Sequence, residues 1–193
     1  MRVCVYCASS DHVARVYHDA ASMLGRTLAQ AGCTLVYGGG ATGLMGSLAN
    51  GALAAGGEVI GVIPRFMIEV EWQHPGLANL ELVEDMRERK HRLLAGGEAV
   101  VALPGGSGTL EELFEAITLK RLALYLNPIV LLDTNGFYAP LQRFLLQMVE
   151  QRFMNRRHLD MWTLVQHVDQ VLPAIRDAPA WAENARDYAA VRD

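Results

Sequence analysis

The chain has 193 residues, of which 51% are hydrophobic and 20% are charged, and its formal net charge is −4. This length suits one domain with a full hydrophobic core. The slightly acidic balance gives no sign of a nucleic-acid-binding surface, and no apolar run is long enough to span a membrane. The first ten residues are typical of a strand rather than of a signal peptide, so we expect a cytoplasmic protein.

Cysteine chemistry is not expected. Cys4 and Cys7 form a C-x-x-C pattern within a predicted strand, where residues three apart point to opposite faces of the sheet. Cys33 is the only other cysteine, so a four-ligand zinc site cannot be assembled from cysteine. We therefore predict no metal, no redox site and no other cofactor.

Five apolar runs of strand length alternate with helical patterns, at residues 3–6, 34–38, 58–64, 99–104 and 128–133. Runs without polar alternation suit strands buried on both faces, and intervening helices suit a parallel sheet. The sequence therefore predicts an α/β fold, Rossmann-like and doubly wound, with a mainly parallel sheet flanked by helices. We expect residues 1–193 to form one domain, with residues after about 178 as a tail.

The first helix is expected between the first two strands. Ser10 or Asp11 would cap its start, and Gly32 would end it. Apolar residues at helical spacing mark its inward face. These are Val13, Val16, Tyr17, Ala20, Ala21, Leu24, Leu28 and Ala31.

A first glycine-rich loop, residues 38–43, joins the second strand to a helix and satisfies G-x-G-x-x-G at Gly38, Gly40 and Gly43. This context predicts a nucleotide or phosphate site, with Gly39, Gly40 and Gly43 as candidate binding residues. Pro64 and Arg65 end the next strand, where NAD binding needs an acidic residue, so NAD is disfavoured. The alternative is that the glycines serve only a tight turn and close helix packing.

Residues 65–79 show no periodicity, and we expect a long loop. Within it, Phe66, Met67 and Trp72 could form an apolar rim beside the candidate site, or they could simply close the loop over the sheet.

A helix is expected after Asp85, with Asp85 as N-cap and Glu88 as its partner. Its first turns are basic, which the helix dipole disfavours. The helical period places Arg89 on the same face as the core residue Leu93. An inward arginine needs an anion, which a bound phosphate or an acidic side chain would supply.

A second glycine-rich loop, residues 105–109, again lies between a strand and a helix, and it contains Gly105, Gly106 and Gly108. Neither loop contains the GK[ST] of a P-loop NTPase. Thr109 and Glu112 fit a T-x-x-E capping box, which would make the glutamate structural. A ligand with phosphate at one end and developing positive charge at the other would instead give the glutamates a function, as in an oxocarbenium-like ribosyl transition state.

Four segments together resemble the LOG (Lonely Guy) family of cytokinin riboside 5′-monophosphate phosphoribohydrolases. They are VYCASS, YGGGATGLMGSLANGAL, MRERK and PGGSGTLEE. The family pattern includes PGGxGTxxE and an M-x-x-R-K helix start, and the motifs agree in order and spacing from about Val3 to Thr118. Ala8 departs from the pattern, because the family usually has glycine there.

The resemblance implies hydrolysis of the N-glycosidic bond of an adenine-type nucleoside 5′-monophosphate, without metal or organic cofactor. Carried over by motif, Arg89 and Glu112 are the catalytic pair. The resemblance also implies a homodimer, and we expect Leu122, Leu124 and Leu126 to extend the apolar surface of the preceding helix. The implied substrate-binding residues are Glu71, Lys90, Gly106, Ser107, Gly108, Thr109, Glu111 and Thr118, with Gly105 in the same loop.

Two alternatives stay open. The first is an AMP nucleosidase with little preference at N6 of the base, and the second is a nucleotide-binding carrier or sensor without turnover. Lysine decarboxylase, a label that members of the family have carried, is disfavoured because hydrolysis explains the glutamates better. That chemistry ordinarily uses pyridoxal phosphate on a lysine, and Lys90 and Lys120 are the only lysines.

Overall fold

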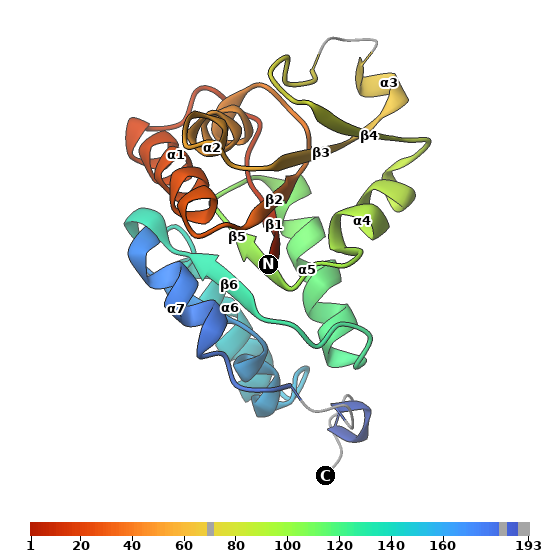
Figure 1. Cartoon of the computed structure of the whole chain (residues 1–193). Coiled ribbons are helices and arrows are strands. Elements are labelled where there is room, and N and C mark those ends of the chain that lie inside the picture. Colours follow the sequence, from red (N-terminus) through yellow and green to blue (C-terminus); the bar gives the residue numbers. More distant parts are fainter. Residues whose placement is uncertain (69–71, 182–184, 189–193) are drawn as a thin grey trace.

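The computed structural model describes residues 1–68, 72–181 and 185–188. Within them lies a seven-stranded sheet in the order β4-β3-β2-β1-β5-β6-β7, in which every adjacent pair is parallel (Figure 1). The predicted Rossmann-like α/β fold is confirmed. The strands are β1 (Arg2–Tyr6), β2 (Thr34–Tyr37), β3 (Val59–Pro64), β4 (Asn79–Val83), β5 (Ala99–Ala102), β6 (Ile129–Leu132) and β7 (Thr163–Val165).

Helices cover both faces of the sheet (Figure 1). On one face, α1 (Arg15–Gln30), α2 (Gly43–Ala54) and α7 (Val171–Arg176) pack against residues such as Val3 and Val5. On the other, α4 (Met86–Leu94), α5 (Ser107–Arg121) and α6 (Ala139–Glu150) pack against Cys4 and Tyr6. Short helices complete the described chain: α3 (Arg65–Ile68) and the 3₁₀ helices at Thr134–Gly136, Arg156–Met161, Val168–Gln170 and Ala185–Tyr188.

The centre of the sheet is where its order reverses. From β1 the chain builds outward through β2, β3 and β4, then crosses back to add β5 on the other side of β1. In open parallel sheets, ligands bind at the carboxyl ends of the strands beside such a switch point. The order of the strands therefore places a candidate site around the carboxyl ends of β1, β2 and β5.

The structure adds two strands that the sequence did not predict, β4 and β7. Both lie at edges of the sheet, where two of the five β4 residues are exposed and β7 has only three residues. Neither strand therefore has the continuous apolar run by which the buried strands were recognised. The expected loop of residues 65–79 is also only partly correct, because it begins with helix α3 and ends at the start of β4.

Two helix starts differ from the prediction. Helix α1 begins at Arg15 with Ala14 as its N-cap, so neither Ser10 nor Asp11 caps it. Its predicted end is confirmed, because Gly32 has a φ of +69° just beyond the last turn. The capping box of α5 is wrong, because the helix begins at Ser107 with Gly106 as N-cap, which places Thr109 inside the first turn.

The start of α4 is as predicted, since the Asp85 carboxylate accepts a hydrogen bond from the Glu88 N–H. In α1, the inward residues Ala21, Leu24 and Leu28 are buried, whereas Val16 is 46% exposed. None of the described helices is both long and apolar enough to cross a membrane.

Two residues after position 178, Trp181 and Arg186, contact the end of α5. The Trp181 indole donates a hydrogen bond to the Lys120 carbonyl (2.7 Å), and Arg186 Nε donates one to the Leu122 carbonyl (2.8 Å). Helix α5 ends at Arg121, so Leu122, Leu124 and Leu126 lie in the loop after it rather than on a helix. The expectation that they continue a helical face is therefore wrong, although Leu124 is 61% exposed.

Candidate functional site

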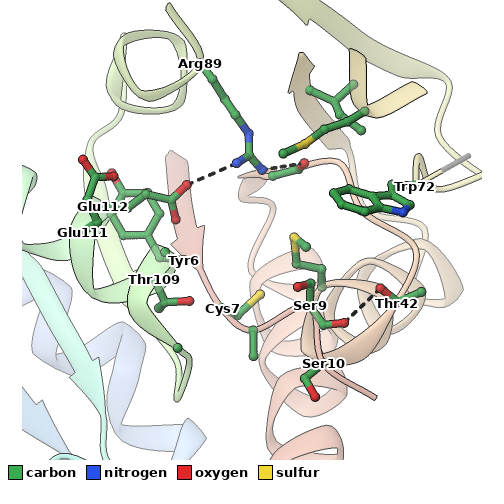
Figure 2. Close-up of a pocket in the computed structure, with 18 of the residues that line it drawn as sticks. Tyr6, Cys7, Ser9, Ser10, Thr42, Trp72, Arg89, Thr109, Glu111 and Glu112 are labelled. Carbon is green, nitrogen blue, oxygen red and sulfur yellow. Dashed lines mark hydrogen bonds and ion pairs between the residues drawn. The ribbon is translucent and has the colours of Figure 1, made fainter. Parts of the chain in front are cut away.

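A cavity of about 600 Å³ lies at the carboxyl ends of the central strands (Figure 2). Its walls come from the loop after β1, the first glycine loop, the β3–α3 region and the first turns of α4 and α5. It therefore occupies the place that the strand order indicates. The lining residues that carry the chemistry discussed below are Arg89, Ser107, Gly108, Thr109, Glu111 and Glu112.

Arg89 lies at the centre of this site and is buried, as its helical face predicted. Its Nη2 donates a hydrogen bond to the Gly38 carbonyl (2.9 Å), and its Nε donates one to the Val62 carbonyl (3.1 Å). Its Nη1 lies 3.6 Å from Glu112 Oε1. Figure 2 shows the guanidinium between the carboxylate and the first glycine loop. An acidic side chain thus supplies the anion that an inward arginine needs.

The pKa of the Glu112 carboxyl group is close to neutrality. The Glu112 side chain is 12% exposed. Burial raises the pKa of this carboxyl group from 4.5 to about 7, although the Arg89 guanidinium opposes the rise. At neutral pH both protonation states are accessible to the group, which suits either electrostatic stabilisation or proton transfer.

The first turn of α5 lines the cavity with Gly106, Ser107, Gly108 and Thr109. In the described part of the chain, the first α5 N–H with a hydrogen-bond acceptor is that of Leu110, which donates to the Gly106 carbonyl (3.0 Å). The preceding N–H groups and the positive end of the helix dipole are suited to an anion.

The first glycine loop is different, because its helix start is already occupied. The N–H groups of Leu44 and Met45 both donate to the Ala8 carbonyl, at 2.9 and 3.2 Å. The Gly43 N–H donates to the Asp11 carboxylate (2.5 Å). Asp11, expected as a cap of α1, therefore supplies the negative charge at the start of α2. The two loops, which look alike in sequence, offer an anion very different surroundings.

The remaining predicted site residues lie at various distances from the cavity. Gly40 lines it, whereas Gly39, Gly43, Gly105 and Thr118 are not among its lining residues. Gly105 allows Thr109 to pack closely against the loop, because a Cβ at position 105 would lie 2.1 Å from the Thr109 hydroxyl. Glu71 lies outside the described residues.

Lys90 lies beside the cavity rather than in its lining. Its Nζ contacts the carboxylates of Glu111 (2.5 Å) and Glu115 (3.3 Å). The hydrogen bond to Glu111 is the main reason why the pKa of Lys90 is raised. Glu111 is 55% exposed and reaches the cavity wall. Lys90 therefore neutralises part of the acidic surface of α5 next to the first turn of that helix.

The opposite wall is apolar and rich in sulfur. Met67 and Trp72 line it, which agrees with the first of the two interpretations of their loop, whereas Phe66 does not line it. Other residues of the cavity lining had no predicted role in the site, although all but Ile63 lie in the segments that carry the family resemblance. They are Val5, Tyr6, Cys7, Ala8, Ser9, Ser10, Thr42, Met45, Ile63 and Met86.

Among the described residues, no group of three or more His, Cys, Asp or Glu side chains is arranged so that it could hold a metal ion. The three cysteines are free and buried. Burial raises the pKa of Cys7, which lines the cavity, well above its usual value. This thiol is therefore not suited to act as a nucleophile.

Comparisons with known proteins agree on one family. A family model described as "Possible lysine decarboxylase" matches residues 45–175. The cytokinin riboside 5′-monophosphate phosphoribohydrolase of Rhodococcoides fascians is 38% identical over 175 residues, with 90% of this chain and 88% of that protein covered. The cytokinin riboside 5′-monophosphate phosphoribohydrolase LOG of Oryza sativa subsp. japonica is 41% identical over 153 residues, with 79% of this chain and 63% of that protein covered. The chain spans 66% and 63% of the length of two further rice relatives.

Solved structures share the fold. The molybdenum cofactor carrier protein of Chlamydomonas reinhardtii superposes with a TM-score of 0.71 at 21% identity, covering 92% of this chain and 96% of that one. A structural genomics target, TM1055, gives a TM-score of 0.71 at 25% identity, covering 91% and 98%.

Proposed function

Because the chain belongs to the LOG family, whose curated relatives are named cytokinin riboside 5′-monophosphate phosphoribohydrolases, we propose that it hydrolyses the N-glycosidic bond of adenine-type nucleoside 5′-monophosphates. Water adds to C1′ of the ribose, and the bond between C1′ and the base breaks with its electron pair on the base. The base takes up a proton, so the products are free base and ribose 5-phosphate.

The observation that carries this proposal is the Arg89–Glu112 pair beside the open start of α5. Arg89 gives the cavity a cation and Glu112 gives it a nearly buried carboxylate. The first turn of α5, which lines the same cavity, offers N–H groups suited to an anion. A nucleoside monophosphate needs these features together, because its phosphate is anionic and its ribose becomes positively charged as the base departs.

In the proposed mechanism, the phosphate binds at the N–H groups of Ser107, Gly108 and Thr109. Glu112, four residues after Gly108, then faces the ribose and either stabilises its developing charge or orients the attacking water. Arg89 holds the substrate and supports departure of the base. Its two hydrogen bonds to main-chain carbonyls fix the guanidinium before the substrate arrives.

The apolar wall suits the base. Met45, Met67 and Trp72 offer flexible and flat surfaces to an adenine ring, and the exposed side of Trp72 leaves room for a substituent at N6. We propose that an isopentenyl-type group contacts this wall. An AMP nucleosidase with little preference at N6 is the alternative within the same chemistry.

Lysine decarboxylation fits the structure poorly. Pyridoxal phosphate would require a lysine amine within the cavity, and the described lining includes none. Lys90 contacts two glutamates beside the cavity. Lys120 is buried at the far end of α5, where its Nζ donates a hydrogen bond to the Asn127 carbonyl.

The decisive experiment is release of free base by the purified protein. We expect adenine from AMP and N6-isopentenyladenine from its monophosphate, each with an equal amount of ribose 5-phosphate, as measured by chromatography. Glu112→Gln is the control for contaminating activity. Tight binding of both nucleotides without release of base would instead identify a carrier or sensor.

We also propose a homodimer in the cytoplasm. The exposed Leu124 beside helices α4 and α5 supports a subunit contact. Three free, buried cysteines are in line with a reducing compartment. Light scattering at micromolar concentration tests the assembly, and a stable monomer would refute it. Cell fractionation tests the location.

A further inference from the structure

The first glycine loop, residues 38–43, has a role that its sequence pattern does not suggest. The start of α2 is closed by the Ala8 carbonyl and the Asp11 carboxylate. A phosphate placed there would have to displace both groups and approach a carboxylate. The glycines of this loop therefore need another physical explanation.

Gly38 has such an explanation in Arg89. A Cβ added at Gly38 would lie 2.2 Å from Arg89 Nη2 and 3.0 Å from Met45 Sδ. The backbone of Gly38 does not itself demand glycine, because its φ is not among the positive values. What excludes a side chain at this position is the guanidinium, which lies against the glycine and donates a hydrogen bond to its carbonyl.

Gly40 has a similar relationship with Met45. A Cβ there would lie 2.7 Å from Met45 Cε and 3.3 Å from its Sδ. Met45 comes from the first turn of α2 and lines the cavity. Two of the glycines therefore leave space for two side chains of the site, one cationic and one apolar.

We infer that Gly38 and Gly40 form a seat for the side chains of Arg89 and Met45, and that Gly38 is a positioning residue for Arg89. The loop shapes the site and binds no phosphate, which leaves the start of α5 as the phosphate-binding turn. The functional part of this inference rests on the proposed hydrolysis, whereas the packing part does not.

The guanidinium has little freedom to avoid an added methyl group. It is buried, and its other nitrogens contact the Val62 carbonyl and Glu112. A Cβ at Gly38 must therefore break the hydrogen bond from Nη2 and move the guanidinium relative to Glu112. A displacement of about 1 Å in a catalytic constellation can cost roughly a hundredfold in rate.

A thermodynamic cycle tests the packing without any assay of activity. Gly38→Ala is made alone and together with Arg89→Ala, and the melting temperature of each protein is measured. We expect Gly38→Ala to lower the melting temperature in the presence of Arg89, and to lower it by less than half as much in the Arg89→Ala background. Equal losses in both backgrounds would overturn the inference.

Gly39→Ala is the matched control. Gly39 has a φ of +75°, so an alanine there is strained by its own backbone. The decrease in melting temperature that Gly39→Ala causes should be the same with and without the Arg89 side chain. This control separates a seat for Arg89 from a general sensitivity of the loop to added side chains.

Two functional measurements complete the test. Gly38→Ala should reduce base release about 10- to 100-fold, and it should reduce it no further in the Arg89→Ala background. Gly40→Ala should bind ribose 5-phosphate in calorimetry within about threefold of the wild-type affinity, because the loop holds no phosphate.

A tenfold loss of ribose 5-phosphate affinity in Gly40→Ala would place the phosphate in the first loop and overturn the inference. A further reduction of rate by Gly38→Ala in the absence of Arg89 would show that the glycine acts by another route. If the wild-type protein releases no base, the proposed function fails, and the melting cycle still decides whether Gly38 seats Arg89.

Discussion

Glu111 and Glu112 are neighbours in sequence, yet they face different surroundings and different cations. Glu112 is nearly buried and lies 3.6 Å from Arg89, whereas Glu111 is 55% exposed and contacts Lys90. Consecutive residues of a helix point about 100° apart, so one glutamate enters the cavity while the next forms its rim. This arrangement is compatible with our proposal that an anion binds at the first turn of an acidic helix, because Lys90 neutralises one carboxylate and leaves the other to face the ribose.

We predict that Glu112→Gln lowers turnover of the monophosphate by roughly 10² or more, because the variant keeps the shape but loses the charge. Steady-state base release measures the effect. Glu88→Gln is the matched control, since Glu88 lies in the first turn of α4, is exposed and accepts a hydrogen bond from the Glu84 N–H. Unaltered kcat in Glu112→Gln would remove the central residue of the mechanism.

The raised pKa of Glu112 predicts a cost in stability at higher pH. Its folded-state pKa of about 7 exceeds the ordinary value of 4.5, so folding favours the protonated form. The associated stability is present below pH 4.5 and is lost as the pH rises through 7. At pH 8, Glu112→Gln should therefore unfold at a higher temperature than the wild type, and its free energy of unfolding should be higher by at most about 3 kcal/mol. At pH 4.5 the melting temperatures of the two proteins should differ little. A reversed order in calorimetry would contradict the assignment.

The 5′-phosphate should be essential for efficient turnover. If the start of α5 binds it, loss of these contacts removes charge-assisted hydrogen bonds that also orient the ribose. We expect kcat/KM for adenosine-type nucleosides to be lower than for their monophosphates by roughly 10² or more. Comparable efficiency on nucleoside and monophosphate, in the same base-release assay, would contradict this placement.

Trp72 should contribute to discrimination at N6. Trp72→Ala removes part of the apolar wall, so the ratio of kcat/KM for N6-isopentenyl-AMP to that for AMP should fall by roughly tenfold. Phe66→Ala is the control, because Phe66 belongs to the same region of the chain and is similarly exposed, but does not line the cavity. An unchanged ratio in Trp72→Ala would leave the wall without a role in substrate choice.

Local patterns were sufficient for the features that depend on neighbouring residues. The buried strands were recognisable because both of their faces are apolar, and the inward direction of Arg89 followed from its helical spacing to Leu93. The N-cap of α4 followed in the same way from Asp85. Edge strand β4 was missed because its exposed residues interrupt the apolar run that marks a buried strand.

Features that depend on distant segments could not be predicted. The capping-box pattern at Thr109 and Glu112 is genuine in sequence, but Thr109 packs against Gly105, and the helix begins at Ser107. The closure of α2 by Asp11 joins residues 32 positions apart. Without that contact, the two glycine loops are equally good candidates for an anion site.

The contacts of Trp181 and Arg186 at the end of α5 have a mechanical consequence for the cavity. This helix has 15 residues, so it is about 22 Å long. The carbonyl of Lys120 in its last turn and that of Leu122 just after it accept hydrogen bonds from Trp181 and Arg186, while its first turn faces the cavity. A tilt of about 5° that pivots on the far end would move Ser107 by about 2 Å over such a length. We therefore expect the contacts of Trp181 and Arg186 to influence the position of the first turn of α5 relative to the rest of the cavity.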